Sequence, residues 1–235
     1  MSFPRIFRRS SALIVGLSVF IYMVLSQTQV FAASRNALRD TISNCLDSTA
    51  LDYCNVCATP RIDSACPGQT DCTARLEIWA ETNNYVALRG RKMCDCPEGF
   101  VHGLVLPKTS VTGVEDPKRP SGIWTFAWKI AQKYIANDLD KALVVNPAKH
   151  RSQDQLHVHI VRLKNDARQR LAKLPQSLIV SLDQVWIVAR EMAQAQHLAD
   201  YGVLVTAHPD RGYLVLIDQE NMEKLYTEAT CNKSP

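Results

Sequence analysis

The alternation of apolar and polar residues predicts several short strands along the chain. Residues 76–90 alternate on both sides of an Asn-Asn pair, which predicts two strands joined by a turn. Residues 102–108, 142–146 and 155–163 each predict one more strand. Residues 201–219 predict a hairpin whose turn is the segment Pro-Asp-Arg-Gly. Hairpins of this kind indicate mainly antiparallel pairing.

A helical period of apolar residues recurs in four other segments. It is clearest at 121–138, where Ser121 is a candidate cap, and it is also present at 34–47, 165–174 and 191–202. Residues 185–190 fit either a strand or a helix. Strands mixed with a few helices predict an α+β fold with a mainly antiparallel sheet flanked by helices. We expect a single domain over residues 34–235, preceded by a separate N-terminal segment.

That N-terminal segment has the pattern of an export signal. Three arginines lie within the first nine residues, and an apolar run, 12–25, leads to the small-residue site Val-Phe-Ala-Ala-Ser. Basic, apolar and small residues in this order predict a secretory signal over residues 1–33, cleaved after Ala32 or Ala33. A retained membrane anchor is the alternative, although the run is short for a spanning helix. In both cases the rest of the chain is exported.

The cysteines fit an exported protein. All of them lie beyond the N-terminal segment: Cys45, Cys54, Cys57, Cys66, Cys72, Cys94, Cys96 and Cys231. An even number in an exported chain favours four disulfides, with residues 48–73 as an irregular stapled loop in an N-terminal extension. A redox pair at Cys-Asn-Val-Cys is an alternative, but it lacks the surrounding strand–helix unit. A zinc site is another, but the cysteine spacing is irregular for zinc.

Charge excludes one class of partner. The chain has 235 residues and a formal net charge of +4, and its lysines and arginines are scattered rather than massed. Nothing therefore indicates a nucleic-acid surface. Mild basicity is compatible with a phosphate ligand or an anionic membrane, and it selects neither.

The candidate chemistry lies in the segment SQDQLHVHIVRL, residues 152–163. Alternate side chains of a strand share one face, so Gln155, His157 and His159 are expected to project together. The intervening apolar side chains are expected to pack into the core behind them: Leu156, Val158 and Ile160. A polar row on a buried strand is a rigid mounting for a site.

Four interpretations of this histidine pair remain open. The pair could be a half-exposed surface feature with no chemical role. It could bind a metal, with further ligands among the remaining histidines, His102, His150, His197 and His208, although their spacing has no pattern. Phosphoesterases with two His-x-Thr or His-x-Ser motifs are disfavoured, because neither histidine is followed by that hydroxyl. The fourth is an imidazole that attacks phosphorus.

The ordered segments resemble a known family. QLHVHIV is similar to the histidine-triad motif, with Gln155 in place of the first histidine. LVVN and the loop PAKHRSQD precede it, HGLVLPK and GIWTFAW lie upstream, and the hairpin YGVLV…YLVLIDQ follows. Together with the N-terminal apolar run, these segments resemble the bacterial CDP-diacylglycerol diphosphatases, a membrane-associated branch of the histidine-triad superfamily. The resemblance runs from YVALRG to the C-terminus and implies a HIT-like domain.

The resemblance also implies roles for individual residues. His157 takes the place of the nucleophile, and His159 that of the third histidine, which orients the site and binds phosphate. Gln155 takes the remaining catalytic position. Four further residues are candidate phosphate contacts: Asn146, Ser152, Gln153 and Lys108. The implied reaction needs no metal and no other cofactor.

Gln155 is the departure from the family's motif, and it removes a general acid, because an amide cannot give up a proton. With the implied substrate, the missing general acid matters less. Phosphatidate leaves as a phosphate monoester with a second pKa near 6, so it needs little protonation, and an amide can still donate a hydrogen bond to it.

The resemblance thus implies hydrolysis of CDP-diacylglycerol to CMP and phosphatidate at the periplasmic face of the bacterial inner membrane, with membrane lipid as partner. Alternatives are a nucleotidyltransferase with another acceptor and a non-catalytic exported metal-binding protein. The sequence does not indicate an oligomeric state.

Two tryptophans bear on the expected lipid substrate. Trp124 and Trp128 lie four residues apart and share one face of the predicted helix. They could sit at a bilayer interface or line an acyl groove. Core packing is the favoured interpretation, because an aromatic stripe on a helix usually faces the core.

Overall fold

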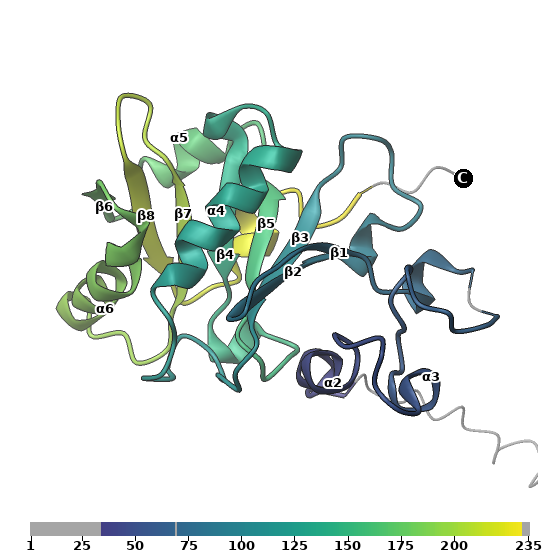
Figure 1. Ribbon diagram of the computed structural model, residues 1–235. Coiled ribbons are helices and arrows are strands. Elements are labelled where there is room, and N and C mark those ends of the chain that lie inside the picture. The colour runs from purple at the N-terminus through teal and green to yellow at the C-terminus, as the bar shows by residue number, and fades with distance from the viewer. Residues whose placement is uncertain (1–33, 69, 232–235) are drawn as a thin grey trace, which may run out of the picture. The chain divides into compact units, whose positions relative to one another are not determined.

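The computed structural model describes residues 34–68 and 70–231, so the predictions for residues 1–33 lie outside the described part (Figure 1). Its centre is an eight-stranded sheet in the order β1-β2-β3-β5-β4-β7-β8-β6. The strands are β1 Ile78–Glu81, β2 Tyr85–Arg89, β3 His102–Pro107, β4 Lys141–Val145, β5 Val158–Arg162, β6 Gln176–Ile179, β7 Gly202–Ala207 and β8 Tyr213–Asp218. Every neighbouring pair is antiparallel, which confirms the predicted pairing and the α+β class.

Two details of the strands differ from the predictions. The strand expected over 155–163 begins only at Val158, so His157 lies just before its first paired residue. Strand β6 was not predicted, because its four residues show little alternation. It forms at the edge of the sheet by pairing with β8, a contact that no local pattern reports.

Four helices follow the predicted periods, with corrections at their ends, whereas α3 and α7 were not predicted. They are α2 Ala37–Asn44, α3 Tyr53–Val56, α4 Gly122–Tyr134, α5 Ala167–Leu171, α6 Val185–Ala195 and α7 Met222–Tyr226. Shorter 3-10 turns cover Cys72–Ala74, Arg91–Met93, Asp138–Asp140, Ala148–His150 and Leu182–Gln184. The ambiguous segment 185–190 begins α6, which ends before the predicted residue 202. Ser121 precedes α4 but forms no side-chain cap, so that expectation was wrong.

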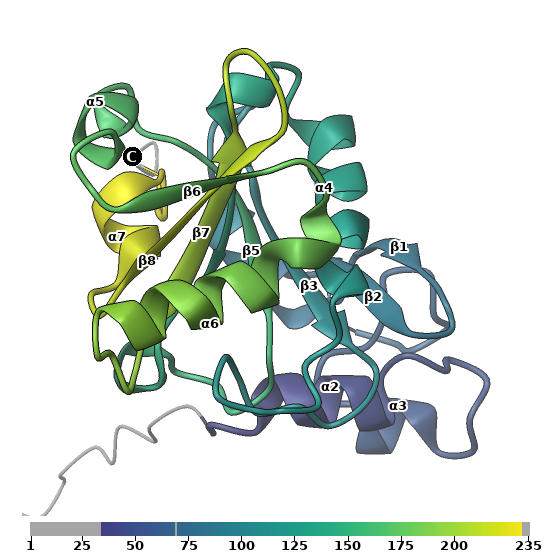
Figure 2. The same ribbon diagram turned by 90° about the vertical axis from the view of Figure 1, so that its left-hand side faces the viewer.

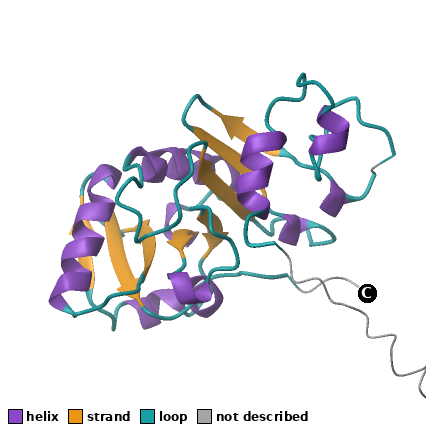
Figure 3. Cartoon of the chain, turned by 90° about the horizontal axis from the view of Figure 1, so that it is seen from below, coloured by secondary structure: helices purple, strands orange, loops and turns teal. Residues whose placement is uncertain are grey.

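Helices cover both faces of the sheet (Figures 2 and 3). Helices α4 and α6 pack on one face and form the largest apolar cluster with the strands. Trp124 and Trp128 are buried there, 0% and 5% exposed, which confirms core packing and leaves neither ring free to meet a bilayer. Helices α5 and α7 contribute to a smaller cluster on strands β4, β5, β7 and β8. No helix among the described residues is both long and apolar enough to cross a membrane.

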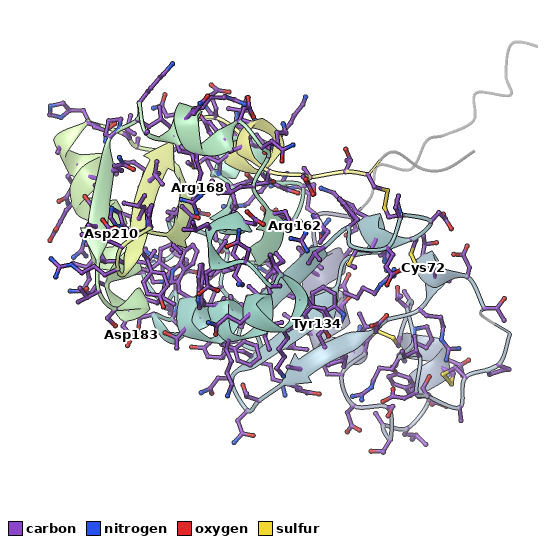
Figure 4. All side chains as sticks on the ribbon, turned by 90° about the horizontal axis from the view of Figure 1, so that it is seen from above. Cys72, Tyr134, Arg162, Arg168, Asp183 and Asp210 are labelled. Atoms are coloured by element: carbon purple, nitrogen blue, oxygen red, sulfur yellow. A yellow bond between two sulfur atoms is a disulfide. The ribbon has the colours of Figure 1, made fainter. Side chains whose placement is uncertain are left out.

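The N-terminal extension packs on β2 and β3 and is stapled as predicted. Tyr53 of α3 and the cysteine residues there form a third cluster with Val86, Leu88 and Leu106. The four disulfides join Cys45 to Cys57, Cys54 to Cys66, Cys72 to Cys94 and Cys96 to Cys231 (Cys72 is labelled in Figure 4). Cys54 and Cys57 bond to other partners, so the redox-pair alternative was wrong. All eight cysteines are oxidised, which also overturns the zinc alternative.

Candidate active site

The site lies on the sheet face opposite α4. Val158 and Ile160 point toward α4 and are 0% exposed, as predicted from the alternation. His159 therefore points to the other face, where its cross-strand neighbours are Leu104 on β3 and Val144 on β4. On this face the apolar cluster of α5 and α7 and the cluster of the N-terminal extension are separate. Three central strands thus present polar side chains between two apolar patches.

His157 is oriented by the backbone of residue 155. Its Nδ1 lies 2.7 Å from the carbonyl oxygen of Gln155. A carbonyl only accepts, so Nδ1 carries the proton and Nε2 carries the lone pair. The residue is 9% exposed, and burial lowers the pKa of the imidazole. His157 is therefore a neutral imidazole with its Nε2 unprotonated, which is the form required of a nucleophile. Its burial also rules out the half-exposed surface pair.

His159 stands edge-on to His157, with ring centroids 4.8 Å apart. It is 6% exposed, and burial lowers its pKa well below the usual value, although the nearby Glu223 opposes that shift. Nε2 of His159 lies 3.4 Å from Oε2 of Glu223. Neither ring nitrogen of His159 has a hydrogen-bond partner among the described residues. The imidazole ring of His159 thus lies beside an anion, and its nitrogens remain able to form a further hydrogen bond.

Glu223, on α7, is the common partner of the polar groups around His159. Nε2 of His102 lies 3.0 Å from its Oε1, and Nζ of Lys92 donates to the same oxygen at 2.7 Å. Nδ2 of Asn146 donates to Oε2 at 2.9 Å. Glu223 is 5% exposed. Burial raises the pKa of this carboxyl, but the neighbouring histidines and Lys92 lower it more, so the group is ionised.

Gln155 has a structural task that its sequence position does not reveal. Its side chain is 0% exposed, and Nε2 donates to the carbonyl oxygens of Pro107 and Thr109 at 3.2 and 2.9 Å. The side chain therefore secures the end of β3, while the backbone carbonyl of the same residue orients His157.

The four candidate phosphate contacts occupy different surroundings. Asn146 belongs to the buried cluster through Glu223, and Ser152 is exposed in the loop before β5. Lys108 instead pairs with Glu81, with Nζ and Oε1 2.6 Å apart. The side chain of Gln153 accepts a hydrogen bond from the backbone N–H of Leu38 and donates one to the carbonyl of Ser34. The structure does not bring Lys108 and Gln153 into the Glu223 cluster.

The loop before β5 is held by the N-terminal extension. Arg35 donates two hydrogen bonds to the carboxylate of Asp154, at 2.7 and 2.6 Å. These bonds lower the pKa of the Asp154 carboxyl to about 2. Arg151 reaches from the same loop to Glu115. Residues 34–39 thus fasten the segment that leads into the histidines, which connects the stapled extension to the site.

Comparison with known proteins identifies the family of the chain. The model of the CDP-diacylglycerol pyrophosphatase family matches residues 69–186, half of the chain. The chain belongs to this family. The CDP-diacylglycerol pyrophosphatase of Yersinia pestis is 27% identical over 160 residues, which cover 53% of this chain and 62% of that protein. The matched family segment contains His102, Asn146, His157 and His159, and it ends before Glu223.

Sequence reasoning missed Lys92 and Glu223 and gave His102 no role other than that of a possible metal ligand. Each of the three lies outside the histidine segment, and no motif surrounds it. The contacts with Glu223 join residues separated by 131, 121 and 77 positions, from Lys92, His102 and Asn146 respectively. The signal available in the sequence was a glutamate shortly after an apolar hairpin. Nothing in the sequence shows that this glutamate is buried.

The structure also bears on the metal alternative. His102, His159 and Glu223 bring potential ligand atoms within 4.8 Å of one another, a set that differs from the expected pair His157 and His159. Lys92 lies 2.7 Å from the same carboxylate and already supplies a positive charge there. A second cation on this carboxylate would be repelled by that charge. The arrangement therefore favours a hydrogen-bonding anion that Lys92 already neutralises over a metal centre. His150 and His208 pair elsewhere, with Glu220 and Asp210.

Proposed function

We propose that this protein hydrolyses CDP-diacylglycerol to CMP and phosphatidate through a nucleotide bound covalently to His157. Family membership supports the substrate class. The observation that carries the mechanism is the hydrogen bond between Nδ1 of His157 and the Gln155 carbonyl, because it leaves the lone pair on Nε2. Burial keeps that imidazole neutral, so it can attack phosphorus.

The reaction proceeds in two displacements. Nε2 of His157 attacks the phosphorus that bears cytidine, and the bond from that phosphorus to the bridging oxygen breaks. Phosphatidate leaves with that oxygen, and a cytidylyl-imidazole remains. Water then attacks the same phosphorus, releases CMP and restores neutral His157. Positioning and preorganised donors supply most of the rate in such transfers.

His159, Asn146 and Ser152 are the proposed phosphate contacts. Neither ring nitrogen of His159 has a hydrogen-bond partner among the described residues, so its N–H can donate to a phosphate oxygen. Nδ2 of Asn146 carries a second hydrogen besides the one that it donates to Glu223. The exposed Ser152 carries a hydroxyl in the loop before β5. This set, together with the order of the segments, is what a HIT-like domain would use, and membership of the histidine-triad superfamily is part of the proposal.

The place of action is proposed from the sequence and the disulfides. Four disulfides form and persist in an oxidising compartment. A basic and apolar N-terminal segment is typical of exported or anchored proteins. Both support action at the periplasmic face of the bacterial inner membrane.

Isotope labelling tests the mechanism directly. In ¹⁸O-labelled water, the label is expected in CMP and not in phosphatidate, because water attacks only the nucleotidyl enzyme. Base quench is expected to trap cytidylate on the protein, since a phosphoramidate bond to imidazole is stable to base and labile to acid. His157→Asn should lose both turnover and trapped nucleotide. Label in phosphatidate, or normal turnover by His157→Asn, would remove His157 from this role.

A further inference from the structure

We infer that Glu223 is the positioning residue of this site: its carboxylate holds His159 and Asn146 in the arrangement that presents His157 to the substrate's phosphate. The inference rests on the proposed function and deepens it, because it concerns the same site. It adds a residue that lies beyond the segment matched by the family model.

The geometry shows that Glu223 acts through other side chains. A carboxylate offers about four acceptor positions. Three are taken by Lys92, His102 and Asn146, and Nε2 of His159 lies 3.4 Å from Oε2. Glu223 is 5% exposed, so its carboxylate acts on these side chains rather than on a substrate. The Glu223 carboxylate contacts side chains from β3, from β5, from the residue after β4 and from the turn Arg91–Met93.

The chain fixes Glu223 from both sides. Asn221 caps α7 by accepting a hydrogen bond from the backbone N–H of Lys224 at 2.8 Å, and Met222 beside Glu223 is 0% exposed. The disulfide between Cys96 and Cys231 then ties the segment after α7 to the stretch that follows Lys92. A charged group held this firmly loses little further freedom when the substrate binds, which is the requirement for preorganised positioning.

The charges around the two imidazoles predict the direction in which the pKa of each histidine changes when Glu223 or Lys92 is replaced. His159 is faced by Glu223, His157, His102 and Lys92, and His157 is faced by Glu223, His102 and Arg151. Glu223 supplies the negative charge in both sets, whereas Lys92 and Arg151 supply positive charge. Removing the charge of Glu223 should therefore lower the pKa of both histidines further, and removing that of Lys92 should raise the pKa of His159.

The first experiment compares Glu223→Gln with the wild type on CDP-diacylglycerol. We expect kcat to fall by roughly tenfold or more, because a carboxylate that orients a catalytic histidine is lost. KM should stay within about threefold, since the amide still reaches Asn146 and does not touch substrate. The acid limb of the pH profile should move to lower pH. Glu191→Gln, at an exposed position on α6, is the matched control and should behave like the wild type.

The second experiment does not depend on turnover. The imidazole pKa values of His157 and His159 are measured by NMR on the full-length protein labelled at histidine, in detergent. Glu223→Gln should lower both values. Lys92→Met, at a side chain 44% exposed, should raise that of His159. Glu223→Asp keeps the charge and should return the two values toward the wild type while restoring kcat only in part.

These outcomes separate the two proposals. If the wild type does not hydrolyse CDP-diacylglycerol but the pKa values move as expected, the proposed function fails and the positioning role stands. Unchanged pKa values in folded Glu223→Gln, or wild-type kcat with an unmoved acid limb, would overturn the role of Glu223. If Glu223→Gln does not fold, Glu223→Asp and Lys92→Met decide: wild-type kcat in folded Glu223→Asp, together with an unmoved His159 pKa in Lys92→Met, would overturn it.

Discussion

The imidazole of His157 is oriented by the backbone, not the side chain, of Gln155. Nδ1 of His157 lies 2.7 Å from the Gln155 carbonyl oxygen. Every residue has that carbonyl, so a glutamine at the first position of the motif keeps the tautomer of His157. A glutamine at this position therefore leaves the orientation of the proposed nucleophile unchanged.

Gln155→Ala is expected to reduce turnover less than His157→Ala does. The backbone hydrogen bond to His157 remains, and the leaving phosphate needs little acid. The variant loses the hydrogen bonds to Pro107 and Thr109, so unfolding free energy should fall by about 1–3 kcal/mol. Steady-state rates and urea unfolding measure the two effects, and Gln132→Ala at an exposed position is the control. Equal, near-total losses of activity in folded protein would give Gln155 an essential chemical role.

Asn146→Ala and Lys108→Ala should differ sharply. Asn146 is 6% exposed and bonded to Glu223, so its loss should reduce kcat/KM by about tenfold or more. Lys108 is engaged with Glu81, and Lys108→Ala should leave kcat/KM within about threefold. Parallel kinetics on the two purified variants measure the difference. A large loss with Lys108→Ala would show that the ammonium leaves Glu81 to bind phosphate.

Stability should fall as the pH drops below about 6.5, the ordinary pKa of histidine. Burial lowers the pKa of His157 and His159 in the folded protein, so as the pH falls through 6.5 the unfolded chain binds protons that the folded chain does not. Unfolding free energy therefore rises with pH in this window. Urea unfolding at several pH values measures the slope, which should be smaller in His159→Gln and unchanged in the exposed control His150→Gln. A flat profile in the wild type would contradict neutral, buried imidazoles.

The disulfides should contribute unequally. Thiol titration of denatured, unreduced protein should detect no free cysteine among the described residues. Replacing Cys96 and Cys231 by serine opens a loop of 135 positions and should cost about 4–5 kcal/mol in the chain-entropy account. Replacing Cys54 and Cys66 opens only 12 positions and should cost about 3 kcal/mol. The first replacement should also lower kcat, because it loosens the segment that carries Glu223. An equal effect of both on kcat would argue against that link.

The sequence by itself determined the elements whose signal is local. Period-two alternation predicted β1–β5 and the final hairpin, and the helical period predicted α2 and α4. The spacing of His157 and His159 indicated that they share a face, and an even number of cysteines in a chain expected to be exported predicted four disulfides. Each of these inferences depends on residues close together in the chain, or on a count.

Only the tertiary structure decided the partners that complete the site. Strand order places β3 and β4 on either side of β5, and α7 then brings Glu223 against all three. His102 and Glu223 are 121 positions apart, and no local pattern links them. Lys108 and Gln153 could be read from the sequence as anion contacts, yet the fold gives them Glu81, Ser34 and Leu38 as partners. Local periodicity determines which face a side chain takes, but which distant groups meet there depends on how the sheet and its flanking helices pack as a whole.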